Sequence, residues 1–242
     1  MILSAEVMLM LAIVGLYLYD STLLLYCNEG ILYPKGKNAW VVNFGSSNVG
    51  VFGKELYVPN PLMFHRPLFR LSWRFEGNNP TQTVDLPRHD FSALTPMVWS
   101  IAIALSMLLP LGFFTSLGDR VLLAALLLIF GNITFALVWV WLNRTKFNLS
   151  NKRFASLAFE SLICPPFALN IVRHLSLNIP VSENLVTAAQ RLQQAESWNK
   201  TRLSLLARLD SEINGEEPES ERFKLLLEYR QSLAIEGDEC QA

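Results

Sequence analysis

Asp20 is a carboxylate in the middle of an apolar run, the stretch LYLYDSTLLLYCNEG at residues 16–30. A second acid, Glu6, lies near the start of the same apolar segment. Inside a bilayer an acidic side chain is costly unless it is protonated or paired, and such acids often bind ions or carry protons. Asp20 and Glu6 are therefore the candidates for an intramembrane or interfacial acidic site.

The depth of Asp20 in the bilayer decides which role it has. The expected membrane spans contain no Lys, Arg or His to pair with this acid, so a position in the lipid would leave its charge unpaired. We favour the alternative in which Asp20 lies at the headgroups and marks the end of the span, with Tyr17 as an interfacial aromatic whose hydroxyl faces water. In a third alternative, a partner subunit satisfies the carboxylate.

Three arginines, Arg66, Arg70 and Arg74, form a second candidate site. In the stretch LFRLSWRF, residues 68–75, polar and apolar side chains alternate, which is typical of a strand with one basic and one apolar face. Arginines beside aromatic rings can bind anionic lipid headgroups or a partner protein, and a solvated strand face is the simpler interpretation. Residues 28–96 carry seven Lys and Arg against five Asp and Glu, too small an excess for binding nucleic acid.

Motifs for catalysis are missing from the sequence. It contains no GxSxG, no phosphate-binding glycine-rich loop and no HExxH. Its three cysteines, Cys27, Cys164 and Cys240, lie far apart without the spacing of a metal site. We therefore expect no enzymatic activity, no metal and no cofactor.

Composition indicates a membrane protein, because 51% of the residues are hydrophobic and only 17% are charged. Residues 97–117 and 121–143 contain no charged side chain, and each run exceeds the roughly 20 residues that span a bilayer. Only GDR separates them, so the region 97–143 is expected to be a transmembrane hairpin. Trp99, Trp139 and Trp141 would lie at one interface.

The first apolar segment, within residues 1–27, is expected to be a further transmembrane helix. It has two registers, residues 2–19 and residues 7–27, and only the second contains Asp20. With the hairpin, this segment predicts an α-helical membrane protein with three transmembrane helices.

Orientation follows from the segment RTKFNLSNKR, residues 144–153, which has four basic residues and no acid. Basic loops remain on the cytoplasmic side. We therefore expect a multi-pass protein of the cell inner (plasma) membrane, with the N-terminus outside and the C-terminus in the cytoplasm.

The cytoplasmic parts are expected to be three. Residues 28–96 predict a small β-rich insertion, with strands in AWVVNF, VGVF, ELYV and LFRLSWRF, and an extended, non-helical VPNPLMFHRPL at residues 58–68. Residues 144–178 predict a basic linker and two interfacial amphipathic helices broken at Pro165 and Pro166, with a fourth crossing as the alternative. In the second of these helices, Asn170, Arg173 and His174 lie opposite the apolar face.

Residues 179–242 predict an acidic helical hairpin, since they carry 7 Lys and Arg against 12 Asp and Glu. Ser182 is the expected cap of its first helix and Asn214-Gly215 the expected end. A second helix is expected to start at Ser220. The two apolar faces should bury each other and dock on the β-rich insertion or on another protein.

These elements indicate an integral membrane scaffold or accessory subunit that binds a partner protein through its β-rich insertion and C-terminal helices. The partners expected are the lipid bilayer and a protein or a second copy of the chain, not nucleic acid. The alternatives are an oligomeric channel or transporter component that uses Asp20, and an immunity-type protein that protects the membrane against a toxin.

Overall fold

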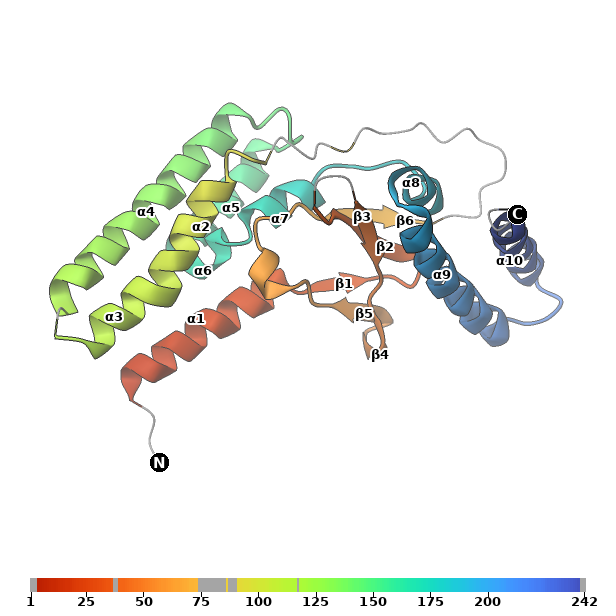
Figure 1. The fold of residues 1–242 in the computed structure, drawn as a ribbon, viewed down its shortest axis with the longest axis horizontal. Coiled ribbons are helices and arrows are strands. Elements are labelled where there is room, and N and C mark those ends of the chain that lie inside the picture. The colour runs from red at the N-terminus through yellow and green to blue at the C-terminus, as the bar shows by residue number, and fades with distance from the viewer. Residues whose placement is uncertain (1–3, 37–38, 74–85, 87–90, 117, 240–242) are drawn as a thin grey trace. The chain divides into compact units, whose positions relative to one another are not determined.

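The computed structural model describes residues 4–36, 39–73, 86, 91–116 and 118–239, with only the backbone given for residues 47, 48 and 235–239. Its residues form two compact units, which we describe separately (Figure 1). The first unit comprises Met1–Leu23, Tyr57–Phe69 and Leu86–Pro180, and the second comprises Leu24–Leu56, Arg70–Asp85 and Val181–Ala242. These units divide the chain differently from the expected segments, because the C-terminal helices share a unit with most of the β-rich insertion.

Helix α1 (Ala5–Ser21) opens the first unit. It ends because Thr22 has extended backbone angles, and strand β1 (Leu23–Leu25) follows at once. The hydroxyls of Ser21 and Thr22 both donate to the carbonyl oxygen of Leu18, at 2.9 and 2.7 Å, which satisfies an acceptor left free at the helix end. The register with a helix over residues 7–27 is therefore wrong, and Asp20 lies in the last turn of α1.

Among the described residues two helices are long and apolar enough to cross a membrane, spanning Thr95–Phe114 and Gly118–Leu142. They correspond to the two runs of the expected hairpin. The 17 residues of α1 measure only about 26 Å at 1.5 Å per residue. Length and composition therefore support a membrane crossing by the two hairpin helices but do not establish one by α1.

The first hairpin helix continues through Pro110 by means of a π-turn. It consists of α2 (Thr95–Ile103), the π-helical segment η2 (Ala104–Leu108) and α3 (Leu109–Phe114). The N–H of Leu109 donates to the carbonyl of Ala104, five residues earlier. Proline has no N–H, so the wider turn accommodates the bond that Pro110 cannot make.

The hairpin closes where this helix approaches α4 (Gly118–Leu142). A Cβ atom added at Gly112 would lie 2.6 Å from Cδ2 of Leu122 and 3.2 Å from its backbone nitrogen, so only glycine fits there. Farther along, Nδ2 of Asn132 donates to Oγ of Ser100 at 3.2 Å. Small and polar residues thus hold the two helices together, as in membrane helix pairs.

Large apolar side chains cover the outward faces of the first unit's helices. On α1 they are Met8, Leu9, Leu11, Val14, Leu16 and Tyr19; on the first hairpin helix Trp99, Ile103, Met107, Leu111 and Phe114; on α4 Leu123, Leu126, Leu127, Leu128, Phe130, Phe135, Val138, Trp141 and Leu142. A water-soluble unit rarely exposes contiguous apolar surface of this kind.

Residues 151–178 form a helical hairpin of their own. It consists of α5 (Asn151–Ile163), the short α6 (Pro165–Ala168) and α7 (Ile171–Leu177). At its open end Nη1 of Arg153 donates to Oδ1 of Asn178 at 3.3 Å. The start of α5 and the end of α7 therefore lie next to each other. The segment is therefore broken at the prolines, as expected, and it turns back instead of running on as a fourth crossing.

The described part of the chain contains two three-stranded sheets. The strands are β1, β2 (Glu29–Pro34), β3 (Trp40–Asn43), β4 (Ser46–Val51), β5 (Lys54–Tyr57) and β6 (Phe69–Ser72). The first sheet has the order β1-β5-β4 and the second β3-β2-β6. Strands β2 and β3 are antiparallel, with Ile31 opposite Asn43 and Leu32 opposite Val42. The four expected strand regions are thus confirmed, whereas β1 and β2 were not predicted.

The stretch expected to be extended contains a short helix. Pro61–Met63 is a 3-10 turn, η1, whose cap is Asn60: its side chain accepts from the N–H of Leu62 at 3.0 Å. The expectation that residues 58–68 are non-helical is therefore wrong at this point. The first residue of a helix has no partner within the helix for its backbone N–H, so a proline there loses no hydrogen bond. Pro61 can therefore start the turn.

Within its described residues, 181–239, the C-terminal part of the second unit contains three helices, not two: α8 (Leu185–Leu192), α9 (Ala195–Gly215) and α10 (Glu221–Glu239). Asn184, not Ser182, caps the first, and the expected single helix is interrupted at Gln193, which is extended. The predicted end at Gly215 is confirmed. So is the start after Ser220, whose Oγ accepts from the N–H of Phe223 at 3.0 Å.

These helices pack on the strands of their own unit and on each other. Helix α8 contacts β2 and β3, and α9 contacts β3 and α10. A Cβ atom at Gly30 in β2 would lie 2.9 Å from Cδ2 of Leu185, which shows how closely α8 approaches the strand. Arg208 of α9 bonds to Oε1 of Glu55 at 2.7 Å and to the carbonyl of Gly45 at 2.8 Å. Docking of the tail on the β-rich insertion is therefore observed within one unit.

Candidate functional site

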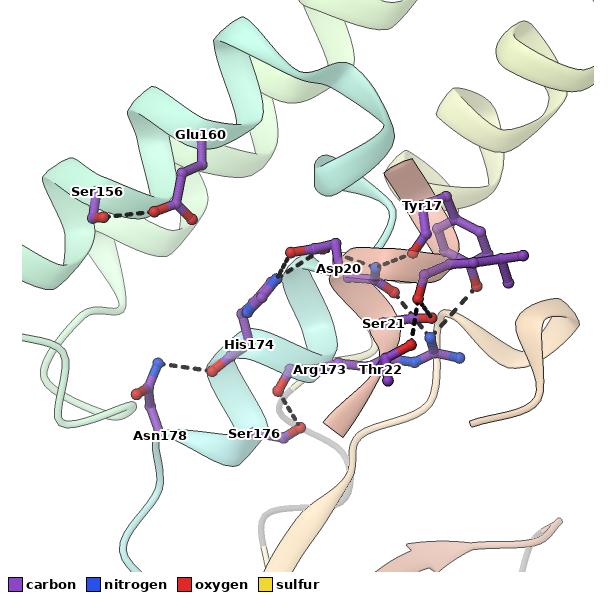
Figure 2. Close-up of polar contacts among 12 residues, drawn as sticks. Tyr17, Asp20, Ser21, Thr22, Ser156, Glu160, Arg173, His174, Ser176 and Asn178 are labelled. Atoms are coloured by element: carbon purple, nitrogen blue, oxygen red, sulfur yellow. Dashed lines mark hydrogen bonds and ion pairs between the residues drawn. The ribbon is translucent and has the colours of Figure 1, made fainter. Parts of the chain in front are cut away.

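The polar residues of the first unit gather at the end of α1. We call the side chains of Tyr17, Asp20, Asn170, Arg173 and His174 the α1–α7 polar cluster. Figure 2 shows Tyr17 and Asp20 on α1 facing Arg173 and His174 on α7. The sequence predicted that Asn170, Arg173 and His174 point away from the packed face. That expectation is wrong for Asn170 and Arg173, which are 1% and 3% exposed.

Asp20 is paired within its own chain. Nε2 of His174 lies 3.0 Å from Oδ2 and 3.2 Å from Oδ1 of Asp20, and Nδ2 of Asn170 donates to Oδ2 at 2.9 Å. A carboxylate only accepts, so Nε2 of His174 carries the proton. A negative charge in the last turn of a helix is unfavourable with respect to the helix dipole, and these donors from outside α1 offset that effect.

Tyr17 is buried, and its hydroxyl does not face water. It donates to the carbonyl of Pro61 at 2.6 Å and lies 3.5 Å from Nη1 of Arg173. The expectation that this hydroxyl is hydrated is therefore wrong. Nη2 of Arg173 in turn donates to the carbonyl of Asn60 at 2.8 Å, so the residues before and at the start of η1 are joined to α1 and α7.

Arg173 is the most deeply buried charge of the cluster. Burial lowers its pKa, and the nearby Tyr17 and Asp20 partly offset this effect. A guanidinium nonetheless stays protonated in proteins. Its Nη1 donates to Oδ1 of Asn170 at 2.9 Å, whereas its Nε is buried without a partner among the described residues.

The α1–α7 polar cluster is suited to holding helices together. Its groups form a chain of bonds from α1 through α7 to the backbone at residues 60 and 61. No described group presents a hydroxyl or thiol to His174 as a nucleophile would require. The geometry therefore favours a fixed junction at the end of α1. The position of Asp20 relative to a bilayer remains a prediction.

Glu6, the other acidic candidate, lies in the first turn of α1. Fourteen residues separate it from Asp20, which is about 21 Å along a helix. The two acids therefore do not form one site.

The three candidate arginines, Arg66, Arg70 and Arg74, are considered one by one. Arg66 belongs to the first unit and Arg70 to the second, while Arg74 lies outside the described residues. Arg70 is exposed, as expected from the alternation in β6, and its Nη2 donates to the carbonyl of Leu24 at 2.9 Å. It also lies 3.8 Å from Glu29. A role of these arginines in binding anionic lipid or a partner remains a prediction.

Among the described residues no group of three or more His, Cys, Asp and Glu side chains is arranged to hold a metal ion. The second unit has a polar groove of about 380 Å³ lined by Cys27, Glu55, Arg208 and Glu212, with Ser204, Ala207 and Ser211. Burial and the neighbouring Glu212 raise the pKa of the Cys27 thiol. A raised pKa disfavours the thiolate, which is the nucleophilic form of a cysteine.

Phe52 is a residue that the sequence interpretation missed. Its ring is 98% exposed at the tip of the β4–β5 hairpin, where Val51 pairs with Lys54. Phe52 and Gly53 have φ angles of +51° and +74°, the signature of a two-residue type I′ turn. Such turns strongly prefer Asn, Asp or Gly, so Phe52 holds a strained conformation. The signal that could have located this turn in the sequence is Gly53, which lies between two short strand patterns.

Comparisons with protein-family models, with curated proteins and with solved structures each found no match to this chain.

Proposed function

We propose that this chain is an integral membrane scaffold or accessory subunit, whose first unit anchors it and whose second unit binds a partner protein in the cytoplasm. The anchoring role is supported by two helices long and apolar enough to cross a membrane. It is also supported by the outward apolar side chains of α1 and α4, such as Leu11 and Leu127, which are 58% and 68% exposed. The basic segment 144–153 supports a cytoplasmic position of the second unit, at the inner membrane of the cell, because basic loops are retained on the cytoplasmic side.

The binding role rests on the exposed ring of Phe52 and its strained backbone. An aromatic ring that is fully exposed in a strained turn reduces the stability of its own unit, and such strain is typical of functional positions. Val49 and Val51, which are 46% and 38% exposed, extend the apolar surface along β4. Aromatic side chains that fill a partner's pocket are frequent hot spots of protein interfaces. Phe52 would therefore enter an apolar pocket of the partner protein.

Photo-cross-linking in the producing cell tests this proposal. The full chain carries p-benzoylphenylalanine in place of Phe52, or, as the matched control, in place of Leu203, an exposed apolar residue on α9 of the same unit. After irradiation the membrane fraction is isolated and adducts are identified by mass spectrometry. We expect one stoichiometric protein adduct from position 52 and none from position 203. A membrane-bound chain without a protein adduct at position 52 would contradict the binding role.

The oligomeric channel or transporter ranks second. It requires Asp20 to line a path between copies, whereas the Asp20 side chain is only 11% exposed and is paired with His174. An adduct between two copies of the chain at position 52 would favour a homo-oligomer. The immunity-type function needs the same anchored architecture, and no specific feature of the described residues favours it.

A further inference from the structure

An apolar groove runs between the last part of α4 and helix α5. It has a volume of about 240 Å³ and is lined by Thr134, Leu137, Val138 and Trp141 of α4 and by Phe154 and Leu162 of α5. The rings of Trp141 and Phe154 lie 4.9 Å apart at one end. Leu162 lines the same groove as Thr134, so α5 runs antiparallel to α4 and the groove follows the helix axis. Its shape and apolar lining suit an acyl chain.

Positive charge gathers at the end of the groove marked by Trp141. The guanidinium of Arg144 lies 4.1 Å above the Trp141 ring, and its Nη1 donates to Oδ1 of Asn151 at 2.7 Å. Lys152 and Arg153 lie in the first turn of α5, next to Phe154, and this turn has no acidic residue. Among the described residues no carboxylate forms an ion pair with Arg144, Lys152 or Arg153.

We propose that this groove is a binding site for an anionic phospholipid, with one acyl chain along Leu137 and Leu162 and the phosphate beside Arg144 and Lys152. The inference rests on the proposed anchoring of the first unit in a bilayer. A zwitterionic lipid would fill the apolar groove equally well but would leave the cations without a net counter-charge. Basic sites beside transmembrane helices on the cytoplasmic side select anionic headgroups in this way. The proposed site uses none of the three arginines Arg66, Arg70 and Arg74.

Quenching of Trp141 fluorescence by brominated lipid tests the inference. The full chain is reconstituted in vesicles of phosphatidylcholine and phosphatidylglycerol, in which either one lipid or the other carries bromine on its acyl chains. The signal of Trp141 is obtained by subtracting the Trp141→Phe variant. We expect quenching of Trp141 to be stronger with brominated phosphatidylglycerol than with brominated phosphatidylcholine at equal mole fraction.

Charge variants give the matched control. Lys152→Gln should reduce the preference for phosphatidylglycerol about fivefold, because one cation near the surface contributes about that factor in binding. Arg144→Gln should do the same, and Lys152→Gln keeps the test valid if Arg144→Gln fails to fold. Arg120→Gln removes the same charge from an exposed position at the opposite end of α4 and should leave the preference unchanged.

Two outcomes would overturn the inference, and they are distinguishable. Equal quenching by the two brominated lipids, in a chain that inserts into the vesicles, would show ordinary contact with surrounding lipid and would leave the proposed anchoring intact. A chain that does not insert into vesicles would contradict the anchoring itself and the lipid site with it.

Discussion

Nε2 of His174 lies 3.0 Å from Oδ2 of Asp20, which joins helix α7 to the last turn of α1 across 154 residues of sequence. This contact shows how the carboxylate is satisfied in an otherwise apolar segment. Asp20 is neither an unpaired intramembrane charge nor a free interfacial group. It is one member of the α1–α7 polar cluster, which fixes the end of α1.

Removal of the Asp20 carboxylate tests the cluster. Asp20→Ala leaves the donors of Asn170 and His174 without an acceptor, so we expect a loss of about 1–3 kcal/mol in the free energy of unfolding. Asp20→Asn keeps one accepting oxygen and should lose less. Thermal unfolding in detergent measures both. Equal stability of Asp20→Ala and the unaltered chain would show that the cluster does not stabilise the first unit.

The strained turn at Phe52 predicts two opposite effects of substitution. Phe52→Asn provides a residue that tolerates positive φ, so the second unit should gain about 1 kcal/mol in stability, or roughly 2–4 °C in melting temperature. Phe52→Val introduces a β-branched residue that disfavours positive φ and should lower the melting temperature. Both variants should recover less of the partner protein that is cross-linked at position 52, because neither side chain replaces the aromatic ring. A destabilised Phe52→Asn would mean that the exposed ring supports its own unit.

Substitution of Gly112 tests the close approach of the two hairpin helices. In Gly112→Ala the new Cβ atom would meet Leu122 at 2.6 Å, so the two helices must separate and thermal stability in detergent should fall by about 1–3 kcal/mol. Gly131→Ala in α4 is the control, because no atom lies within 4 Å of a Cβ atom there and the substitution should be neutral or stabilising. Leu122→Ala should restore part of the stability lost in Gly112→Ala. Equal effects of the two glycine substitutions would contradict the close packing.

Elements that depend on local pattern were predictable from the sequence. The charge-free runs predicted the two hairpin helices. β-branched or aromatic runs punctuated by Gly, Ser and Asn predicted three of the strands, and the alternation in residues 68–75 predicted a fourth. The break of residues 154–178 at Pro165 followed from proline chemistry.

Features that depend on tertiary contacts were not predictable. Helical periodicity placed Arg173 opposite an apolar face, but it carries no information about a distant partner such as Tyr17. The interruption of the helix at Gln193 lacks a Gly or Pro signal in the sequence. Phe52 was missed because its turn has phenylalanine where Asn or Asp is usual.

We propose above that the first unit anchors the chain in a bilayer so that the second unit can bind a partner. The most direct test is flotation of carbonate-washed membranes from cells that produce the full chain. Alkaline carbonate removes proteins held only by surface contacts, whereas apolar helices of the length of Thr95–Phe114 and Gly118–Leu142 remain in the lipid. We expect the chain to float with the lipid after the wash. Recovery of the chain with the soluble proteins at the bottom of the gradient would contradict it.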